Sequence, residues 1–255
     1  MRRTVSKIEN IRDFQESIRA RNIGMFNLSD VGVAIVGCGA IGSFTASTLA
    51  RSGVARFRLY DPDDVAPENI GVQDFHVNQL GVPKVYAVSD TLSSINPMIS
   101  TTTTITKVDN EYRIGWYSVG SNNPLKTCLI MAVDSMRSRR SIANAINNAI
   151  NDRGIRNFDC VIDARMGSET FQMYTFSPFK LEEYMETWYS DEEGDSEACA
   201  GRSTAYCGSM AGSFITNEVK KQFTDDNIKT REMVFSFPSL LLESKIHKPK
   251  IKSMD

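Results

Sequence analysis

The chain has 255 residues, of which 41% are hydrophobic and 24% are charged, an ordinary composition for a globular protein of one or two domains. Its formal net charge of -2 provides no overall basic field to hold nucleic acid or an anionic membrane. Two histidines, and five cysteines without a C-x-x-C pair, argue against zinc sites and a disulfide framework. With no signal peptide and no long apolar stretch, we expect a cytoplasmic protein without a membrane segment.

The first part of the chain alternates predicted helices and strands. Residues 8–20 carry a periodic apolar stripe, which predicts a surface helix. The continuous apolar run at 32–37 is typical of a strand buried on both faces. A helix over 43–53 and a strand over 55–60 follow, so this unit is βαβ and predicts a parallel sheet.

The remainder of the chain continues this pattern. We expect helices over 83–94, 138–150 and 208–223, and strands over 101–108, 127–133, 159–164, 170–176 and 233–237. The predicted fold class is α/β, a Rossmann-like, mostly parallel sheet flanked by helices, with additional β-strands in the C-terminal third.

The predicted organisation is a single main domain with short extensions. We expect an N-terminal helical segment at 1–30, the main domain at 31–243 and a basic tail at 244–255. Acidic residues gather at 182–197, which predicts a mobile loop at about 178–200.

A glycine-rich turn follows the first predicted strand. Gly37, Gly39 and Gly42 form a G-x-G-x-x-G pattern, in which the glycines permit a tight turn, close approach of a phosphate or ribose, and close packing of helix on strand. Asp61 ends the next strand, where a carboxylate can accept ribose hydroxyls. The pattern predicts nucleotide binding; the alternative is a tight turn that binds nothing.

Further polar residues favour nucleotidyl transfer over hydride transfer. Asp134 ends another apolar strand, so its carboxylate and that of Asp61 are expected to face one crevice. A lysine for phosphate oxygens and a carboxylate for magnesium suit that chemistry. Between Asp61 and Asp134 the sequence contains four further candidate polar residues: Asp63, Asn69, Gln73 and Lys84.

These residues, in this order, resemble the ThiF/MoeB family, the adenylating core shared with ubiquitin-activating enzymes. The similar segments are VAIVGCGAIGS, DPDDVAPEN, Asn69 with Gln73, GVPK, INP, the strand ending in Asp134 with Arg139 beyond it, VIDARMG, and Cys207-Gly208 opening a helix. They extend from about Val33 to Lys221, which is most of the chain.

The resemblance implies ATP-dependent adenylation of a carboxylate, with release of pyrophosphate. The usual substrate is the C-terminal glycine of a ubiquitin-like or sulfur-carrier protein, or of a peptide, and the enzyme is expected to be a homodimer that binds neither nucleic acid nor membrane. It implies that Gly37, Gly39, Ala40, Ile41 and Gly42 shape the nucleotide turn, Asp61 holds the ribose, Asp63, Asn69 and Gln73 line the phosphate side, Lys84 contacts phosphates, and Asp134 holds magnesium.

The sequence departs from the family pattern at three points. Val72 stands where the family has an arginine, a group whose loss can slow phosphoryl-type transfer by orders of magnitude. Ser135 replaces an asparagine, and the paired C-x-x-C motifs are missing, so we expect no structural zinc. The candidate replacements for the arginine are Arg12, Arg19 and Arg21 in the N-terminal segment, of which Arg21 is taken as the catalytic candidate, and Arg165. Each is alternatively a surface arginine.

Cys199, at the end of the acidic segment, is a candidate for thioester transfer, as in many relatives. Nearby Arg202 would lower the pKa of its thiol, whereas the preceding carboxylates would raise it. We expect the other cysteines to serve packing: Cys38, Cys128, Cys160 and Cys207. Phe171, Tyr174 and Phe176 form either a docking surface for a ubiquitin-like partner or ordinary core.

Three functional hypotheses therefore remain. The first is an adenylating enzyme that uses ATP and magnesium as cofactors. The second, motivated by Val72, is a non-catalytic nucleotide-binding subunit of a heteromeric activating enzyme. The third is a NAD-dependent oxidoreductase, which only the glycine turn and Asp61 support.

Overall fold

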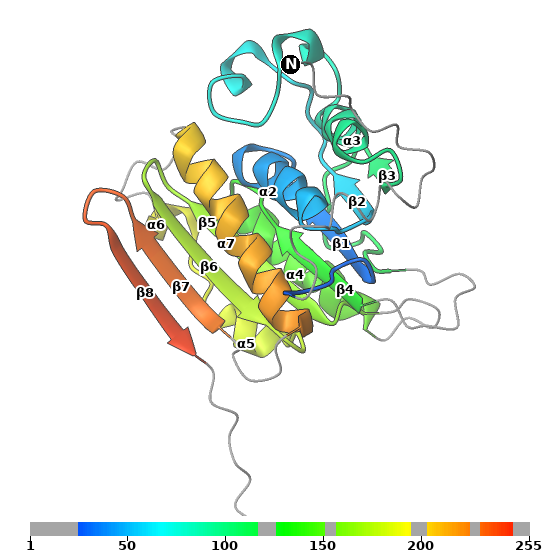
Figure 1. Cartoon of the computed structure of the whole chain (residues 1–255). Helices are drawn as coiled ribbons and strands as arrows, with labels where there is room; N and C mark the ends of the chain where they lie inside the picture. The colour runs from blue at the N-terminus through cyan, green and yellow to red at the C-terminus, as the bar shows by residue number, and fades with distance from the viewer. Residues whose placement is uncertain (1–24, 117–125, 151–156, 195–202, 225–229, 247–255) are drawn as a thin grey trace, which may run out of the picture.

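The computed structural model describes residues 25–116, 126–150, 157–194, 203–224 and 230–246. In this part of the chain eight strands form one sheet, in the order β3-β2-β1-β4-β5-β6-β7-β8 (Figure 1). The strands are β1 (Val31–Val36), β2 (Arg56–Tyr60), β3 (Ser100–Thr104), β4 (Lys126–Met131), β5 (Cys160–Met166), β6 (Thr170–Phe176), β7 (Thr230–Ser236) and β8 (Leu241–Ile246).

The sheet is parallel in one part and antiparallel in the other. β1 pairs with β2 and β4, and the parallel part continues to β3 and β5. From β5 to β8 every pair is antiparallel. The predicted α/β class, with a mostly parallel sheet and extra C-terminal strands, is confirmed. Strand order reverses between β1 and β4, the position at which open α/β sheets bind ligands.

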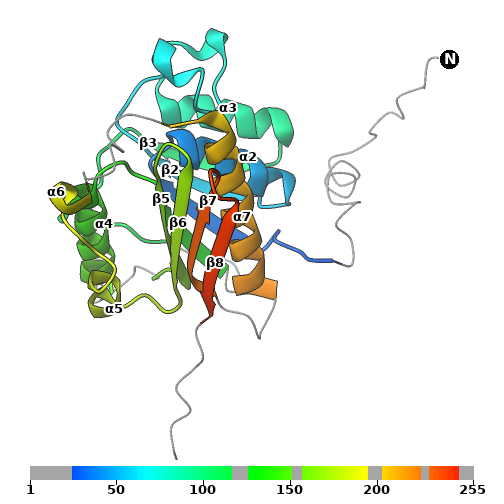
Figure 2. The same ribbon diagram turned by 90° about the vertical axis from the view of Figure 1, so that its left-hand side faces the viewer.

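Helices cover both faces of the sheet (Figure 2). On one face lie α2 (Ala40–Arg51), α3 (Lys84–Ile95) and α7 (Ala205–Thr224); on the other lie α4 (Met136–Ala149), α5 (Leu181–Met185) and α6 (Asp191–Gly194). Short 3-10 helices occur at Pro67–Asn69 and Val77–Gln79.

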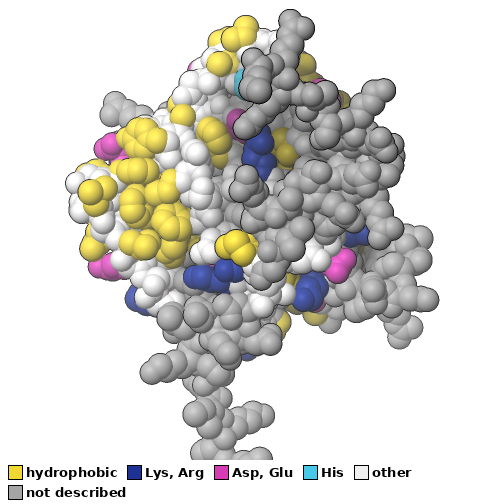
Figure 3. Space-filling view, in the orientation of Figure 1, with side chains coloured by type: hydrophobic (Ala, Val, Ile, Leu, Met, Phe, Trp, Pro, Cys, Tyr) yellow, Lys and Arg dark blue, Asp and Glu magenta, His cyan; other side chains and the backbone are white. Residues whose placement is uncertain are grey.

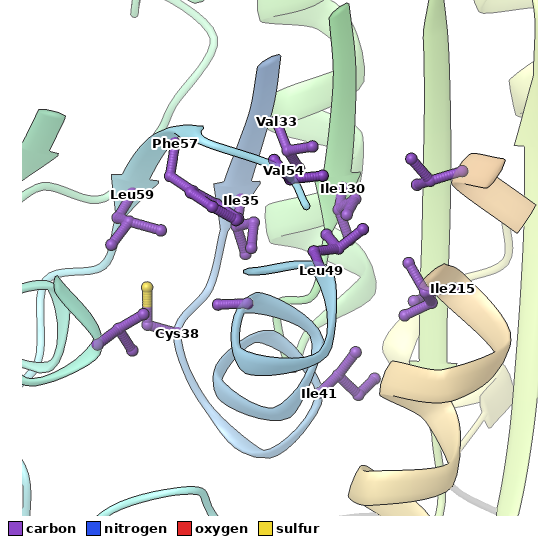
Figure 4. Close-up of a cluster of buried hydrophobic side chains, with 14 of the residues drawn as sticks. Val33, Ile35, Cys38, Ile41, Leu49, Val54, Phe57, Leu59, Ile130 and Ile215 are labelled. Atoms are coloured by element: carbon purple, nitrogen blue, oxygen red, sulfur yellow. The ribbon is translucent and has the colours of Figure 1, made fainter. Parts of the chain in front are cut away.

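The position of β1 at the centre of the sheet explains why its sequence is apolar throughout. Val33 and Ile35 belong to the buried cluster under α2 and α7, whereas Ala34 and Val36 belong to the cluster under α4. Figure 4 shows Val33 and Ile35 near Leu49 of α2, with Ile215 of α7 beyond. Since successive side chains of a strand point to opposite faces, a strand covered on both sides has no polar position.

Several predicted elements differ from the structure. The strand expected over 101–108 ends at Thr104. The acidic segment, expected to be a mobile loop, contains α5 and α6. A further strand, β8, crosses the boundary expected between the main domain and the basic tail at residue 244. The helix expected over 8–20 lies outside the described residues.

Helices α2 and α7 pack with almost no space between their backbones. A Cβ atom on Gly208 would lie 3.0 Å from the carbonyl oxygen of Ala40, and one on Gly212 would lie 2.9 Å from the backbone carbon of Phe44. Two glycines one helical turn apart on α7 thus let it approach the first turns of α2, which directly follow Gly37 and Gly39 and contain Gly42.

We predict that Gly212→Ala lowers the free energy of unfolding by roughly 1–3 kcal/mol, because the added methyl group must push backbone away from backbone. Gly71→Ala is the matched control, since a Cβ there meets nothing within 4 Å; it should change stability by less than about 0.5 kcal/mol. Urea unfolding followed by circular dichroism measures both, and equal effects would contradict the close packing.

Candidate functional site

Three chain segments meet at the carboxyl ends of β1, β2 and β4. The N–H of Gly37 donates to the carbonyl of Tyr60 at 2.8 Å, and the N–H of Ala132 donates to the carbonyl of Val36 at 2.8 Å. Gly37 has φ +95°, and a Cβ there would lie 2.5 Å from the carbonyl oxygen of Ala132. The turn after β1 therefore requires glycine on both conformational and steric grounds.

The turn leads directly into the N-terminus of α2. A Cβ on Gly42 would lie 1.9 Å from the carbonyl oxygen of Gly37, so the helix packs tightly on the turn. At Gly39 the situation is opposite: the nearest atom to a Cβ would be Gln73 Nε2 at 3.9 Å. Gly39 caps α2 without a side-chain hydrogen bond, which leaves the N–H groups of Ala40 and Ile41 suited to an anion.

Asp61 follows β2 and is only 5% exposed. Its carboxylate accepts the N–H of Cys38 at 2.6 Å and that of Asp63 at 2.9 Å. Burial raises the pKa of Asp61, while these N–H groups and the charge of Lys84 act in the opposite direction. The result is a buried acceptor fixed beside the glycine turn, the position in which a carboxylate takes ribose hydroxyls.

Lys84 is the first residue of α3 and its side chain is largely buried. Its Nζ lies 3.0 Å from Asp63 Oδ2, and its N–H donates to the carbonyl of Asp63 at 2.9 Å. The ammonium group is thus held near the end of β2 by a carboxylate that is itself mostly exposed. A phosphate that displaced Asp63 would meet a cation already in place.

Asn69 and Gln73 lie in the loop between β2 and α3 and serve different purposes. The side-chain oxygen of Asn69 accepts the N–H of Ala66 at 2.9 Å and closes the first 3-10 turn. The oxygen Oε1 of Gln73 is buried and has no hydrogen-bond partner within the described chain. A buried polar atom without a partner costs about 1–3 kcal/mol, so Gln73, beside the open Gly39, is suited to accept a hydrogen bond from a ligand.

Contacts of the neighbouring Asp74 with α2 hold Gln73 in position, and the local sequence pattern does not predict them. The N–H of Asp74 donates to Ser43 Oγ at 3.0 Å, and Ser47 Oγ donates to the carboxylate of Asp74. Ser43 Oγ in turn donates to the carbonyl of Gly39 at 2.7 Å. The spacing of the two serines, one helical turn apart on α2, is the only feature of the sequence that hints at a shared partner. That partner, Asp74, lies 27–31 residues away.

Asp134 follows β4 and is exposed at the same edge of the sheet. In the described parts of the chain no group of three or more His, Cys, Asp or Glu residues could hold a metal ion. Magnesium, however, is commonly bound by one or two carboxylates together with water and substrate phosphates. An exposed carboxylate at the same edge of the sheet as the glycine-rich turn fits that pattern.

A buried ionic cluster holds the end of β4. Asp163 is fully buried and accepts hydrogen bonds from Arg139 and Arg165, the latter through Nε at 2.9 Å and Nη2 at 2.7 Å. Arg139 also donates to the carbonyls of Met131 and Val133. The backbone immediately before Asp134 is therefore fixed by a guanidinium group whose charge is balanced by Asp163.

Arg165 does not fit its suggested role as a replacement for the arginine missing at Val72. Besides Asp163 it donates to the carbonyl of Thr187 at 2.9 Å, and its guanidinium lies 4.6 Å from the ring centre of Tyr174. Asp163 raises the pKa of Arg165 against the effect of burial. The charge of Arg165 is therefore paired inside the fold. The expectation that Arg165 replaces the missing arginine is corrected.

The acidic segment is anchored beside Asp134. The carboxylate of Asp191 accepts the N–H groups of Met136 at 2.6 Å and Arg137 at 3.2 Å, and Trp188 Nε1 donates to the carbonyl of Met136 at 2.8 Å. An acidic residue at the first turn of α4 is also favoured by the helix dipole. Cys199, Arg12, Arg19, Arg21 and Arg202 lie outside the described residues.

The remaining cysteines and aromatic residues serve packing. Cys38, Cys128, Cys160 and Cys207 are buried, and burial raises the pKa of Cys207 to about 11. Phe171 and Phe176 are buried in the core, so the packing explanation for them is confirmed. In the part of the chain that the structure describes, no helix is long and apolar enough to cross a membrane.

Comparison with known proteins connects this geometry to a family. The ThiF family matches residues 14–253. Ubiquitin-like modifier-activating enzyme 5 of Drosophila simulans is 31% identical over 209 residues, covering 76% of this chain and 50% of that protein. The protein of the same name from Branchiostoma floridae is 37% identical over 134 residues, covering 50% of this chain and 32% of that protein. The chain spans about half the length, or less, of these relatives.

Solved structures share the fold at lower identity. Selenomethionine PaaA has a TM-score of 0.58 and 20% identity, covering 92% of this chain and 67% of that one. Escherichia coli MccB with ATP has a TM-score of 0.60 and 15% identity, covering 90% of this chain and 66% of that one. At these identities the likeness concerns the fold alone.

We predict that Asp163→Asn lowers the free energy of unfolding by roughly 3–5 kcal/mol, because two buried guanidinium groups lose their counter-charge. Lys180→Ala is the control: its ion pair with Glu183 is exposed and should contribute less than about 1 kcal/mol. Denaturant unfolding compares the two variants. A loss as small for Asp163→Asn as for the control would show that the cluster is not a structural necessity.

Proposed function

The chain belongs to the ThiF family, and from this premise we propose that it uses ATP and magnesium to adenylate a carboxylate. The observation that carries the proposal is the meeting of four groups at one edge of the sheet: the open glycine turn, buried Asp61, the Lys84 ammonium and exposed Asp134. These groups match in kind and order what a ribonucleoside triphosphate requires.

In the proposed reaction a carboxylate oxygen attacks the α-phosphorus of ATP. The bond from this phosphorus to the bridging oxygen breaks, pyrophosphate leaves, and an acyl-adenylate remains. Asp61 holds the ribose, Gln73 and the first N–H groups of α2 hold the nucleotide, and Lys84 neutralises the negative charge that moves onto pyrophosphate. Magnesium bound through Asp134 would supply further charge neutralisation at the phosphates.

The substrate we propose is the C-terminal glycine of a ubiquitin-like protein, a sulfur-carrier protein or a peptide. Support comes from relatives named as ubiquitin-like modifier-activating enzymes and from E. coli MccB, which has been crystallised with MccA. We further propose that the protein acts in the cytoplasm as a homodimer.

Two residues outside the described chain complete the proposal. Arg21 is proposed to supply the cation that Val72 lacks, since Arg139 and Arg165 are both bound to Asp163. Cys199 is proposed to accept the acyl group as a thioester, since the four described cysteines are buried. Trp188 and Asp191, both anchored at the first turn of α4, precede Cys199 in the sequence by 11 and 8 residues.

A second candidate function is a non-catalytic nucleotide-binding subunit that requires a partner chain. The observation that favours it is the combination of Val72 in the nucleotide loop with the engagement of Arg165 inside the fold. The two functions differ in one measurable property: only an enzyme forms the adenylate when the purified chain is the sole protein besides the carrier.

We predict that the chain catalyses ATP–pyrophosphate exchange with a glycine-ended carrier, and that Asp134→Ala slows the exchange about 100-fold or more by removing the proposed magnesium ligand. Asp90→Ala, which removes an exposed carboxylate from α3, should exchange at the wild-type rate. No exchange by the chain alone, with exchange restored by a partner subunit, would support the second candidate. Equal rates for wild type and Asp134→Ala would contradict the role of Asp134.

We predict that Asp61→Asn weakens ATP binding roughly 10–100-fold, because a carboxylate acceptor of ribose hydroxyls is lost. Wild type should prefer ATP over 2′,3′-dideoxy-ATP, whereas the variant should bind the two alike. Calorimetric titration measures both, with thermal unfolding as a check of the fold. Undiminished discrimination in the variant would contradict the ribose contact, and tight binding of NAD without binding of ATP would support the oxidoreductase.

A further inference from the structure

Strand β8 is the edge of the sheet and offers one unpaired side. It pairs with β7 alone, and no described element lies outside it (Figures 1 and 2). The one irregularity of this hairpin is between Thr230 and Glu232 on β7, so β8 itself is regular. A regular edge strand presents a row of free N–H and C=O groups that can pair with another strand.

Apolar side chains surround this edge. In Figure 3 hydrophobic residues gather where the β7–β8 hairpin and the first half of α7 lie. Leu240, Leu241 and Leu242 are 76%, 52% and 52% exposed. Phe237 lies between Tyr206 and Phe235, with ring centres 4.7 and 4.9 Å apart. A contiguous exposed apolar surface of this kind marks an interaction site or an aggregation hazard.

The charges on β8 are arranged to complement themselves. Glu243 and Lys245 lie two residues apart and therefore on the same face of the sheet, with Ser244 between them. Glu243 is opposite Val234 on β7, and Lys245 is opposite Glu232, to whose carboxylate its Nζ donates at 2.8 Å within the same chain. If a second β8 runs antiparallel alongside the first with Ser244 opposite Ser244, each Glu243 lies opposite a Lys245.

We propose that β8 pairs in this way with β8 of a second copy of this chain, so that the two sheets form one continuous sheet across a twofold axis at Ser244. The axis stands perpendicular to the sheet, so residues that face α7 in one copy meet residues that face α7 in the other. Leu242 lies on that face, because it is opposite Phe235, whose ring contacts Phe214 of α7. The exposed apolar surfaces of the two hairpins then lie on a shared face.

Neighbouring registers are less favourable. An axis at Glu243 puts Glu243 opposite Glu243, and an axis at Lys245 puts Lys245 opposite Lys245; like charges directly opposite one another destabilise a strand pair. An axis at Leu242 puts Leu241 opposite Glu243. The register at Ser244 alone among these pairs both charged residues with opposite charges, and this self-complementarity favours a second copy over an unrelated strand.

The proposed β8 contact depends on the proposed function in one respect only: it supplies an interface for the proposed homodimer. It involves no step of the proposed reaction. Its test therefore measures association and not activity. Sedimentation equilibrium through the micromolar range should show a dimer for wild type. Glu243→Lys and Lys245→Glu should each weaken it roughly tenfold or more, because both charge pairs become repulsive.

An equimolar mixture of the two variants is the decisive sample. In a mixed dimer every lysine again faces a glutamate, so association should return towards the wild-type value. Each variant alone serves as the control for the other, and thermal unfolding checks that both remain folded. Ser244→Cys should in addition form a disulfide between two copies on mild oxidation, whereas Leu241→Cys should not.

Three outcomes would overturn the proposal. One is a wild-type monomer throughout the concentration range. Another is a dimer that the single variants and their mixture leave unchanged, which would place the interface elsewhere. The third is protection of the β8 amides from hydrogen exchange only when a carrier protein is added, which would assign the edge to the carrier. None of these results depends on whether the chain forms an adenylate.

Discussion

The close approach of backbone to backbone at Gly37 is the constraint on which the site depends. No Cβ fits between Gly37 and Ala132, and none fits between Gly42 and Gly37. β1, β4 and α2 consequently converge at a single point, and the groups that follow β2 and β4 open onto the same space. A side chain at position 37 or 42 would separate these elements and move Asp61 and Asp134 relative to one another.

Two buried carboxylates, those of Asp163 and Asp61, show how the surroundings of a side chain determine whether it stabilises the fold or is suited to bind a ligand. Asp163 lies between Arg139 and Arg165, which neutralise it and are themselves held by backbone carbonyls. Asp61 accepts two N–H groups, and burial raises its pKa because these groups and the charge of Lys84 compensate its charge only in part. A carboxylate whose charge is fully compensated stabilises a fold, whereas one that is buried and only partly compensated is prepared for a ligand.

Most of the fold could be predicted from local sequence patterns. The apolar run of β1 and the spacing of its glycines are local properties, and they predicted the strand, the turn and the parallel sheet. The acids at strand ends followed from the same reasoning, since parallel strands end at one edge. Contacts between distant residues could not be predicted: Asp74 meets Ser43 and Ser47 across 27–31 residues, and Asp191 meets α4 across 55. β8 was missed because its sequence is short and mixed, and only the neighbouring β7 makes it a strand.

The described segments before and after residues 195–202 lie on opposite faces of the sheet. α6 ends at Gly194 on the α4 side of the sheet, shortly after Asp191 is bound beside Asp134. α7 begins at Ala205 on the α2 side, and Gly208 packs against Ala40 at the start of α2. The two described ends, Gly194 and Ala205, thus flank the carboxyl edge of the sheet from opposite faces. The cysteines of the described sheet, Cys128 and Cys160, are buried, so neither thiol could reach a ligand at that edge unless the core opened.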